Sequence, residues 1–201
     1  METRTIRQTT VVLPCQEADD LEPCDAPPPN GTAISGRAVK ADSWTRAILT
    51  SVTIARTRFT NADLSSARFD GVSWDRCSLR GCTLVGAHLE GGTLKNVIFE
   101  NCRLDYATLS KIRATGPVAF LGCSMTETMI NRCQFSGAVF DACKLTDTEF
   151  DSTDLRGADL RGNDLSNLVG VQSLRQTILS PGQLAGLTEA TVRELALTLK
   201  S

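Results

Sequence analysis

A repeat of five residues is the feature of this sequence that most limits how the chain can fold. Between residues 47 and 165 a large apolar side chain recurs at every fifth position, with one interruption. We call these positions centres: Leu49, Ile54, Phe59, Leu64, Phe69, Trp74, Leu79, Leu84, Leu89, Leu94, Phe99, Leu104 and Leu109, then Phe120, Met125, Ile130, Phe135, Phe140, Leu145, Phe150, Leu155, Leu160 and Leu165. This period fits neither an α-helix nor the alternation of a flat strand. The sequence therefore predicts a solenoid, whose short units bury their apolar sides only by stacking on neighbours.

A small residue stands two positions before most centres, as Ala62, Ala67 and Cys77 do, and polar residues fill the other positions. Two side chains in five are thus expected to point inward and three outward. The run Asp154-Leu155-Arg156-Gly157-Ala158-Asp159-Leu160 resembles the pentapeptide repeat family, whose loose consensus is A(D/N)LXX. The resemblance implies an all-β fold, a right-handed quadrilateral β-helix with four pentapeptides, and hence 20 residues, in each coil.

The one break in the five-residue period provides a test of the predicted solenoid within the sequence itself. After Leu109 the register passes through Ala114, and the next centre is Phe120, six residues on. One extra residue at Thr115-Gly116-Pro117 suits a bulge. With that insertion, coils of 20 residues align one column of centres as the core stack: Phe59, Leu79, Phe99, Phe120, Phe140 and Leu160.

The solenoid is expected to span residues 31–165, with a degenerate first coil because Arg37 and Asp42 occupy inward positions. Residues 1–30 are acidic and carry Pro27-Pro28-Pro29, so we expect a flexible N-terminal arm. The alternative is that Val11-Val12-Leu13 caps the open end of the solenoid.

The eight cysteines invite a disulfide or metal interpretation. Six of them occupy small inward positions, namely Cys77, Cys82, Cys102, Cys123, Cys133 and Cys143. Because a column of parallel side chains does not converge as a zinc site requires, we expect these thiols to serve as core packing. Cys15 and Cys24 have no assigned role. No apolar run suggests a signal peptide or membrane span, which favours a reducing, cytoplasmic setting.

Residues 166–201 are expected to form a C-terminal helical module for capping or dimerisation. Ser180, Pro181 and Gln183 predict a helix start, and Thr188 suits the cap of a second helix. Val192, Leu195, Ala196 and Leu199 then follow helical spacing on one face. This face either closes the end of the solenoid or joins two chains as a homodimer. The module resembles the one with which the Qnr and MfpA group of bacterial pentapeptide repeat proteins joins two rods end to end.

No catalytic motif is recognisable, and neither a cofactor nor a metal is expected, so an enzyme is disfavoured. The net charge of −2 gives no basic footprint for direct nucleic-acid binding. Charge is uneven, however: residues 120–165 carry eight acids against four bases. From these acids we predict a partner-binding acidic face of Asp147, Glu149, Asp151, Asp154, Asp159 and Asp164.

Two functional hypotheses follow. Members of the Qnr and MfpA group resemble DNA in shape and charge, bind type II topoisomerases and modulate quinolone or toxin sensitivity. The resemblance therefore implies that this chain binds DNA gyrase or topoisomerase IV as a DNA mimic. The second hypothesis is a non-enzymatic structural scaffold that binds another protein through its faces, because a fold does not fix a function. Neither hypothesis involves a membrane or a small-molecule substrate.

Overall fold

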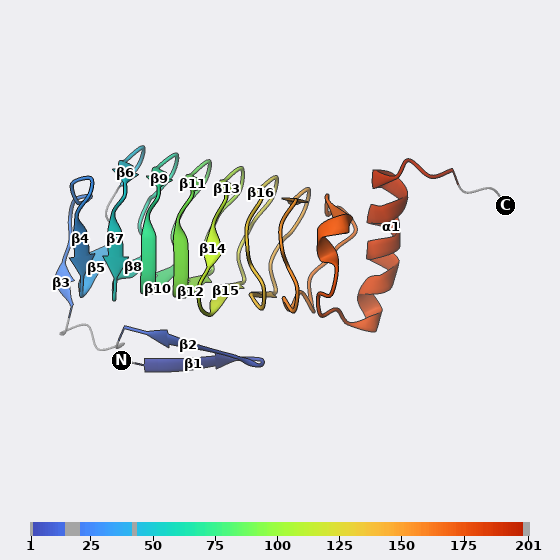
Figure 1. The fold of residues 1–201 in the computed structure, drawn as a ribbon, viewed down its shortest axis with the longest axis horizontal. Coiled ribbons are helices and arrows are strands. Elements are labelled where there is room, and N and C mark those ends of the chain that lie inside the picture. Colours follow the sequence, from blue (N-terminus) through green and yellow to red (C-terminus); the bar gives the residue numbers. More distant parts are fainter. Residues whose placement is uncertain (1, 15–20, 42–43, 199–201) are drawn as a thin grey trace.

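The computed structural model describes residues 2–14, 21–41 and 44–198. It is a β-solenoid of about six turns with one C-terminal helix of 14 residues, counting the 3₁₀ turn that begins it. Successive coils lie side by side along a straight rod (Figure 1). The fold class predicted from the repeat is confirmed.

Two parallel sheets form three of the four sides of the rod. The larger has 10 strands: β3 (Glu22–Pro23), β4 (Ala33–Ser35), β5 (Arg37–Lys40), β7 (Thr53–Ala55), β8 (Arg58–Thr60), β10 (Ser73–Arg80), β12 (Thr93–Glu100), β14 (Arg113–Ala114), β15 (Val118–Leu121) and β17 (Val139–Asp141). The smaller has six: β6 (Ile48–Thr50), β9 (Arg68–Asp70), β11 (His88–Glu90), β13 (Thr108–Ser110), β16 (Met129–Asn131) and β18 (Glu149–Asp151).

We name the four sides of the rod by their strands. The β9 face is the smaller sheet. The larger sheet bends around a corner because β10 and β12 each pair with separate strands at their two ends. Its first half, with β4, β7 and β14, is the β7 face, and its second half, with β5, β8, β15 and β17, is the β8 face. The fourth side, the bridge face, has isolated parallel bridges that link Asp63, Thr83, Arg103, Ser124 and Lys144 in turn.

The centres fill the interior of the rod in register. Leu79 pairs with Phe59 and Phe99, and Phe120 pairs with Phe99 and Phe140, so the predicted column is aligned through these five residues. The rings of Phe99, Phe120 and Phe140 stack at centroid distances of 4.8 and 4.9 Å. All six members of the column, Leu160 included, are no more than 1% exposed.

The extra residue lies where the sequence places it. Leu94 pairs with Ala114, twenty positions on, whereas Val97 pairs with Val118, twenty-one positions on. The insertion is therefore between Ala114 and Val118, at the Thr115-Gly116-Pro117 segment, and the aromatic stack continues beyond it.

The first coil contains β4 and β5, which pair with strands of the second coil. Ile34 pairs with Ile54, and Val39 pairs with Phe59. The Arg37 side chain leaves the interior at the open end and forms an ion pair with Glu22, while Asp42 lies outside the described residues. Strand β3 pairs with β5 and so covers part of the first coil.

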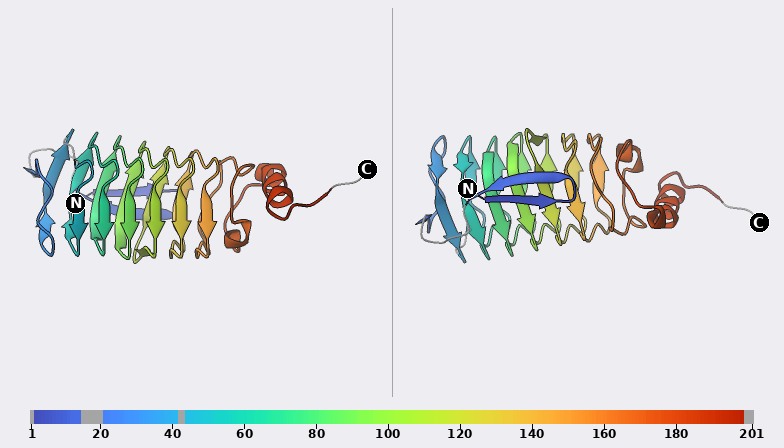
Figure 2. Two further views of the ribbon diagram at one scale, coloured as in Figure 1. Left: turned by 90° about the horizontal axis from the view of Figure 1, so that it is seen from above. Right: turned by 90° about the horizontal axis from the view of Figure 1, so that it is seen from below.

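The N-terminal segment is not a flexible arm over residues 2–14, and it does not cap the open end. Strands β1 (Glu2–Ile6) and β2 (Thr9–Leu13) form an antiparallel hairpin. The hairpin runs along the rod, across the coils of the β8 face (Figure 2). Ile6, Val11 and Leu13 make a second hydrophobic cluster with Ile98, Ala119, Leu121 and Val139. The reason is local: Ile98, Ala119 and Val139 are apolar at outward positions of the β8 face, where the same column carries Arg58, Ser78 and Asp159 in other coils.

The coil path continues past Leu165, beyond the predicted end of the repeats. Glu149 bridges Val169, and Asp159 bridges Ile178. The first step is 20 residues and the second is 19, so one residue is missing and the five-residue period is lost from the sequence. A 3₁₀ turn at Val171–Leu174 lies in this final coil.

Up to residue 198, where the described part of the chain ends, one helix rather than two follows. The 3₁₀ turn Pro181–Gln183 leads directly into α1 (Leu184–Glu194), and Thr188 is an interior residue whose hydroxyl donates to the Leu184 carbonyl. The helix ends earlier than the apolar spacing predicts. Leu197 N donates to Val192 O and Ala196 N donates to Arg193 O, with Ala196 in the left-handed conformation, which is a Schellman stop.

Candidate protein-binding surfaces

The six predicted acids do not share one face. Glu149 and Asp151 lie on the β9 face, in β18. Asp147 lies on the edge between the bridge face and the β9 face, and Asp164 lies on the bridge face, one coil beyond Lys144. Asp154 is on the β7 face, where it bridges Gln134, and Asp159 is on the β8 face, where it bridges Val139.

Asp154 and Asp159 are also held by arginines. Asp154 forms an ion pair with Arg156 at 2.7 Å. Asp159 is only 6% exposed and pairs with both Arg161 and Arg7, each at 2.6 Å. These two carboxylates are therefore internally neutralised, and the predicted acidic face is corrected to a smaller set.

Together with a fifth acid, the remaining four predicted acids lie on the β9 face, the bridge face and the edge between them, with Lys144 next to Asp164. Glu127 precedes Asp147 in the edge column, because Glu127 N donates to Thr146 O as Asp147 N does to Asn167 O. No ion pair involves these five carboxylates among the residues that the structure describes. We call Glu127, Asp147, Glu149, Asp151 and Asp164 the acidic surface. The sequence spacing could have predicted the place of Glu127, because Glu127 precedes Asp147 by 20 residues, the length of one coil.

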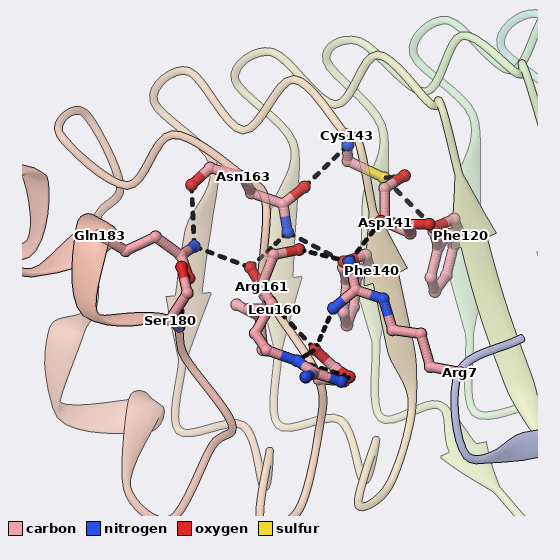
Figure 3. A network of polar contacts seen from close by, with 11 residues as sticks. Arg7, Phe120, Phe140, Asp141, Cys143, Leu160, Arg161, Asn163, Ser180 and Gln183 are labelled. Carbon is pink, nitrogen blue, oxygen red and sulfur yellow. Dashed lines mark hydrogen bonds and ion pairs between the residues drawn. The ribbon is translucent and has the colours of Figure 1, made fainter.

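Arg7, at the turn of the hairpin, fastens the N-terminal segment to the rod (Figure 3). Its guanidinium donates to Asp141 at 2.5 Å, to Asp159 at 2.6 Å and to the Arg161 carbonyl at 2.8 Å. Burial works against the Asp159 carboxylate, but hydrogen bonds from the Arg161 side chain and backbone, with the charge of Arg7, hold its pKa below the usual value. Sequence reasoning missed this contact because Arg7 lies 152 positions from Asp159.

The helix is fastened to the last coil by a second polar contact. Thiols at the inward positions donate to centre carbonyls of the preceding coil, as Cys143 Sγ does to Phe120 O at 3.3 Å. In the same column Asn163 Nδ2 donates to Phe140 O at 2.9 Å, and Gln183 Nε2 donates to Leu160 O at 2.8 Å (Figure 3). Gln183 Oε1 also accepts from Ser180 N at 2.8 Å, which completes the predicted helix start.

The six inward cysteines are buried and free, as core packing requires. Burial raises the pKa of the Cys77 thiol to about 12 and that of Cys133 to about 11, so neither is a thiolate at neutral pH. Cys24 is half-buried beside the first coil, and Cys15 lies outside the described residues. Within the described part of the chain, no group of three His, Cys, Asp or Glu residues is placed to hold a metal ion.

The helix α1 covers the open C-terminal end of the rod with one side (Figure 1). Ala190 is fully buried, and Arg193 and Glu194 bind backbone groups of the last coil. Exposed leucines stand at the two ends of the helix: Leu184, its first residue, is 59% exposed, and Leu195 and Leu197, beyond its last residue, are 60% and 50% exposed.

The predicted dimer residues are spread between these environments. Val192 is half-buried, Leu195 and Ala196 are exposed beyond the end of the helix, and Leu199 lies outside the described residues. In the part of the chain that is described, no helix is long and apolar enough to cross a membrane.

The repeats match a known family. The model of the family "Pentapeptide repeats" matches residues 57–96, 84–116 and 133–167, with eight copies. Together with the solenoid, this makes the chain a pentapeptide repeat protein. Proteins of this kind are typically non-enzymatic.

Solved structures of other pentapeptide repeat proteins resemble it at low identity. A trypsin-treated variant of QnrB1, a plasmid-mediated fluoroquinolone resistance protein, is 15% identical, with 85% of this chain and 99% of that chain covered and a TM-score of 0.43. HetL from the cyanobacterium Nostoc sp. strain PCC 7120 is 18% identical, with 74% and 87% covered and a TM-score of 0.29. A thylakoid-lumen protein of Arabidopsis thaliana is 15% identical, with 80% and 77% covered and a TM-score of 0.25. No curated protein sequence matches this chain.

Proposed function

We propose that this chain is a non-enzymatic binding protein that engages a basic surface of another protein through its acidic surface, and that a type II topoisomerase is that partner. The observation that carries the proposal is the position of Glu127, Asp147, Glu149, Asp151 and Asp164 on two adjacent faces of a rigid rod. DNA-binding surfaces are basic, so complementary charge would speed the encounter and make it sensitive to salt.

DNA mimicry on this chain is confined to one part of the rod. The β7 face carries Arg56, Lys95, Arg113 and Arg175, none of which forms an ion pair within the described part of the chain. A duplex is negative on all sides, whereas this rod carries the acidic surface on one side and the bases of the β7 face on another. A partner would therefore contact it from one direction. The competing proposal, a scaffold for some other protein, requires no topoisomerase. Both proposals assume that the protein is in a reducing, cytoplasmic setting.

A charge-matched pair of variants tests the topoisomerase proposal. We expect the combined substitutions Glu127→Gln, Asp147→Asn and Glu149→Gln to weaken binding to gyrase about tenfold, so that about tenfold more protein is needed for the same effect on supercoiling. Each exposed pair contributes roughly 0–1 kcal/mol, and about 1.4 kcal/mol is a factor of ten. The measurement is supercoiling by gyrase, and decatenation by topoisomerase IV, at several salt concentrations with and without a quinolone.

The control removes three acids nearer the N-terminal end of the rod, one on the bridge face and two on the β9 face. Asp63→Asn lies on the bridge face, and Asp70→Asn and Glu90→Gln lie on the β9 face. This control should act as the wild type does. Absence of any wild-type effect at micromolar concentration would reject the topoisomerase. An effect that both variants retain in full would reject the acidic surface as the contact.

We also propose that two chains pair through the outer side of α1. Exposed leucines at the end of a rod are the kind of apolar surface that a twofold interface buries. Changing Leu184, Leu195 and Leu197 to Ser should convert a dimer into a monomer in sedimentation at micromolar concentration. The melting temperature of the resulting monomer should stay close to that of the wild type, because these side chains are exposed.

Ile48→Ser, at a side chain that is 65% exposed on the β9 face, is the control and should leave the dimer intact. A wild-type chain that sediments as a monomer contradicts the proposal and leaves α1 as an end cap.

A further inference from the structure

Two large apolar side chains lie exposed beside the acidic surface. Tyr106 is 57% and Met129 is 46% exposed. Tyr106 is in the edge column that continues with Glu127 and Asp147 on the next two coils, as the bonds Tyr106 N to Thr126 O and Glu127 N to Thr146 O show.

Met129 is in the adjacent column of the β9 face. There it pairs with Thr108 on one side and Glu149 on the other. Because neighbouring strands lie about 4.8 Å apart, Tyr106 and Met129 stand on adjacent coils with Glu127 next to both. Asp147 and Glu149 occupy the coil after that.

The side chain of Tyr106 sets it apart from the other corner residues. Its φ is 61°, in the left-handed region, which is unfavourable for a bulky side chain. The fold requires this conformation at its corners, and glycine, asparagine, serine or flexible charged residues supply it at most of them. Tyr106 is the one aromatic residue among the described non-glycine residues with positive φ. The exposed ring does not offset this conformational cost by burial.

From this we propose that Tyr106 and Met129 are an anchor pair for a partner protein that presents an apolar socket within a basic surface. Tyrosine and methionine are enriched at the centres of interfaces, where a few side chains carry most of the affinity. Methionine adapts its shape to such sockets. The flanking carboxylates of Glu127, Asp147 and Glu149 supply the rim and select basic surroundings.

A second copy of this chain is a poor occupant of this patch. Pairing the patch with itself would bring three carboxylates of each copy together, and like charges across an interface oppose association. The inference therefore rests on the acidic surface of the proposed function, but it does not require that the partner be a topoisomerase.

Two synthetic peptides of equal positive charge test the anchor pair on the full-length chain. One alternates lysine with leucine and the other alternates lysine with serine. We expect the Lys/Leu peptide to bind at least tenfold more tightly, with amide shifts in NMR spectra centred on residues 106, 127, 129 and 147. A chain with Tyr106→Asn and Met129→Thr should lose this advantage and bind the Lys/Ser peptide unchanged.

The substitutions are chosen so that folding does not confuse the result. Asparagine accepts positive φ, so Tyr106→Asn should leave the melting temperature unchanged or raise it. Ile48→Ser is the matched control, because Ile48 is 65% exposed in the same column as Met129 but four coils away, beside Arg68. It should retain the tenfold difference.

Equal affinity for the two peptides, an equal loss in the Ile48→Ser control, or shifts centred on another face would each overturn the anchor pair. The gyrase assay separates this inference from the proposed function. A chain that has no effect on gyrase but still discriminates between the peptides keeps the anchor pair and rejects the topoisomerase. A chain that acts on gyrase without discriminating keeps the proposed function and rejects the anchor pair.

Discussion

Replacing Phe99 or Phe140 by Ala should each lower the free energy of unfolding by about 3–5 kcal/mol. Both rings are no more than 1% exposed, and each stacks on Phe120 with planes within 10° of parallel. Alanine would leave a cavity that the neighbouring coils cannot fill, because the hydrogen-bonded ladder fixes their spacing. Urea or guanidinium melts of the full-length chain measure the loss.

The chain itself supplies the control for this prediction. Leucine occupies the same column naturally at Leu79 and Leu160. Phe99→Leu and Phe140→Leu should therefore cost clearly less than the alanine substitutions, since leucine leaves a smaller void. Losses below about 1 kcal/mol for both alanine variants would be incompatible with a close-packed aromatic column.

The repeat made the interior of this protein predictable. A five-residue period tells which side chains face inward, and one inserted residue had to fall where glycine and proline allow it. The alignment of Phe99 with Phe120 and Phe140 follows from that counting alone. Local chemistry at the helix start was also readable, as the Ser180 and Gln183 contacts are.

The exterior was less predictable because the five-residue period does not distinguish the four faces. Counting in coils of 20 would have separated Asp154 and Asp159 from Asp147, as it aligned the phenylalanines. The hairpin was hidden for another reason: its contacts join Arg7 and Val11 to residues 85 or more positions away. The apolar outward residues Ile98, Ala119 and Val139 were the available sign that something covers the β8 face.

Breaking the ion pairs between the hairpin and the rod should also strongly lower the free energy of unfolding, and the size of this loss should depend on pH. Removing both arginines of Asp159, with Arg7→Ala and Arg161→Ala, leaves a nearly buried carboxylate without a cation. Breaking a buried pair in this way costs about 3–5 kcal/mol, so we expect a loss of that order at pH 7. Arg156→Ala is the control: it breaks the corresponding pair with Asp154, whose arginine is 66% exposed, and should cost no more than about 1 kcal/mol.

The sign of the pH dependence distinguishes the loss of the Asp159 ion pairs from the loss of hairpin packing. In the wild type the arginines hold the Asp159 pKa below its value in the unfolded chain, so this stabilisation is present above about pH 4 and is lost as the pH falls through the folded pKa. In the double variant, burial without a cation raises that pKa. The penalty should therefore be largest at neutral pH and shrink as the pH falls toward about 4, where Asp159 becomes neutral. Adding Asp159→Asn to the double variant should recover much of the loss at pH 7 and remove its pH dependence. A loss that stays constant from pH 7 to pH 4 would instead assign the effect to the lost packing of the hairpin.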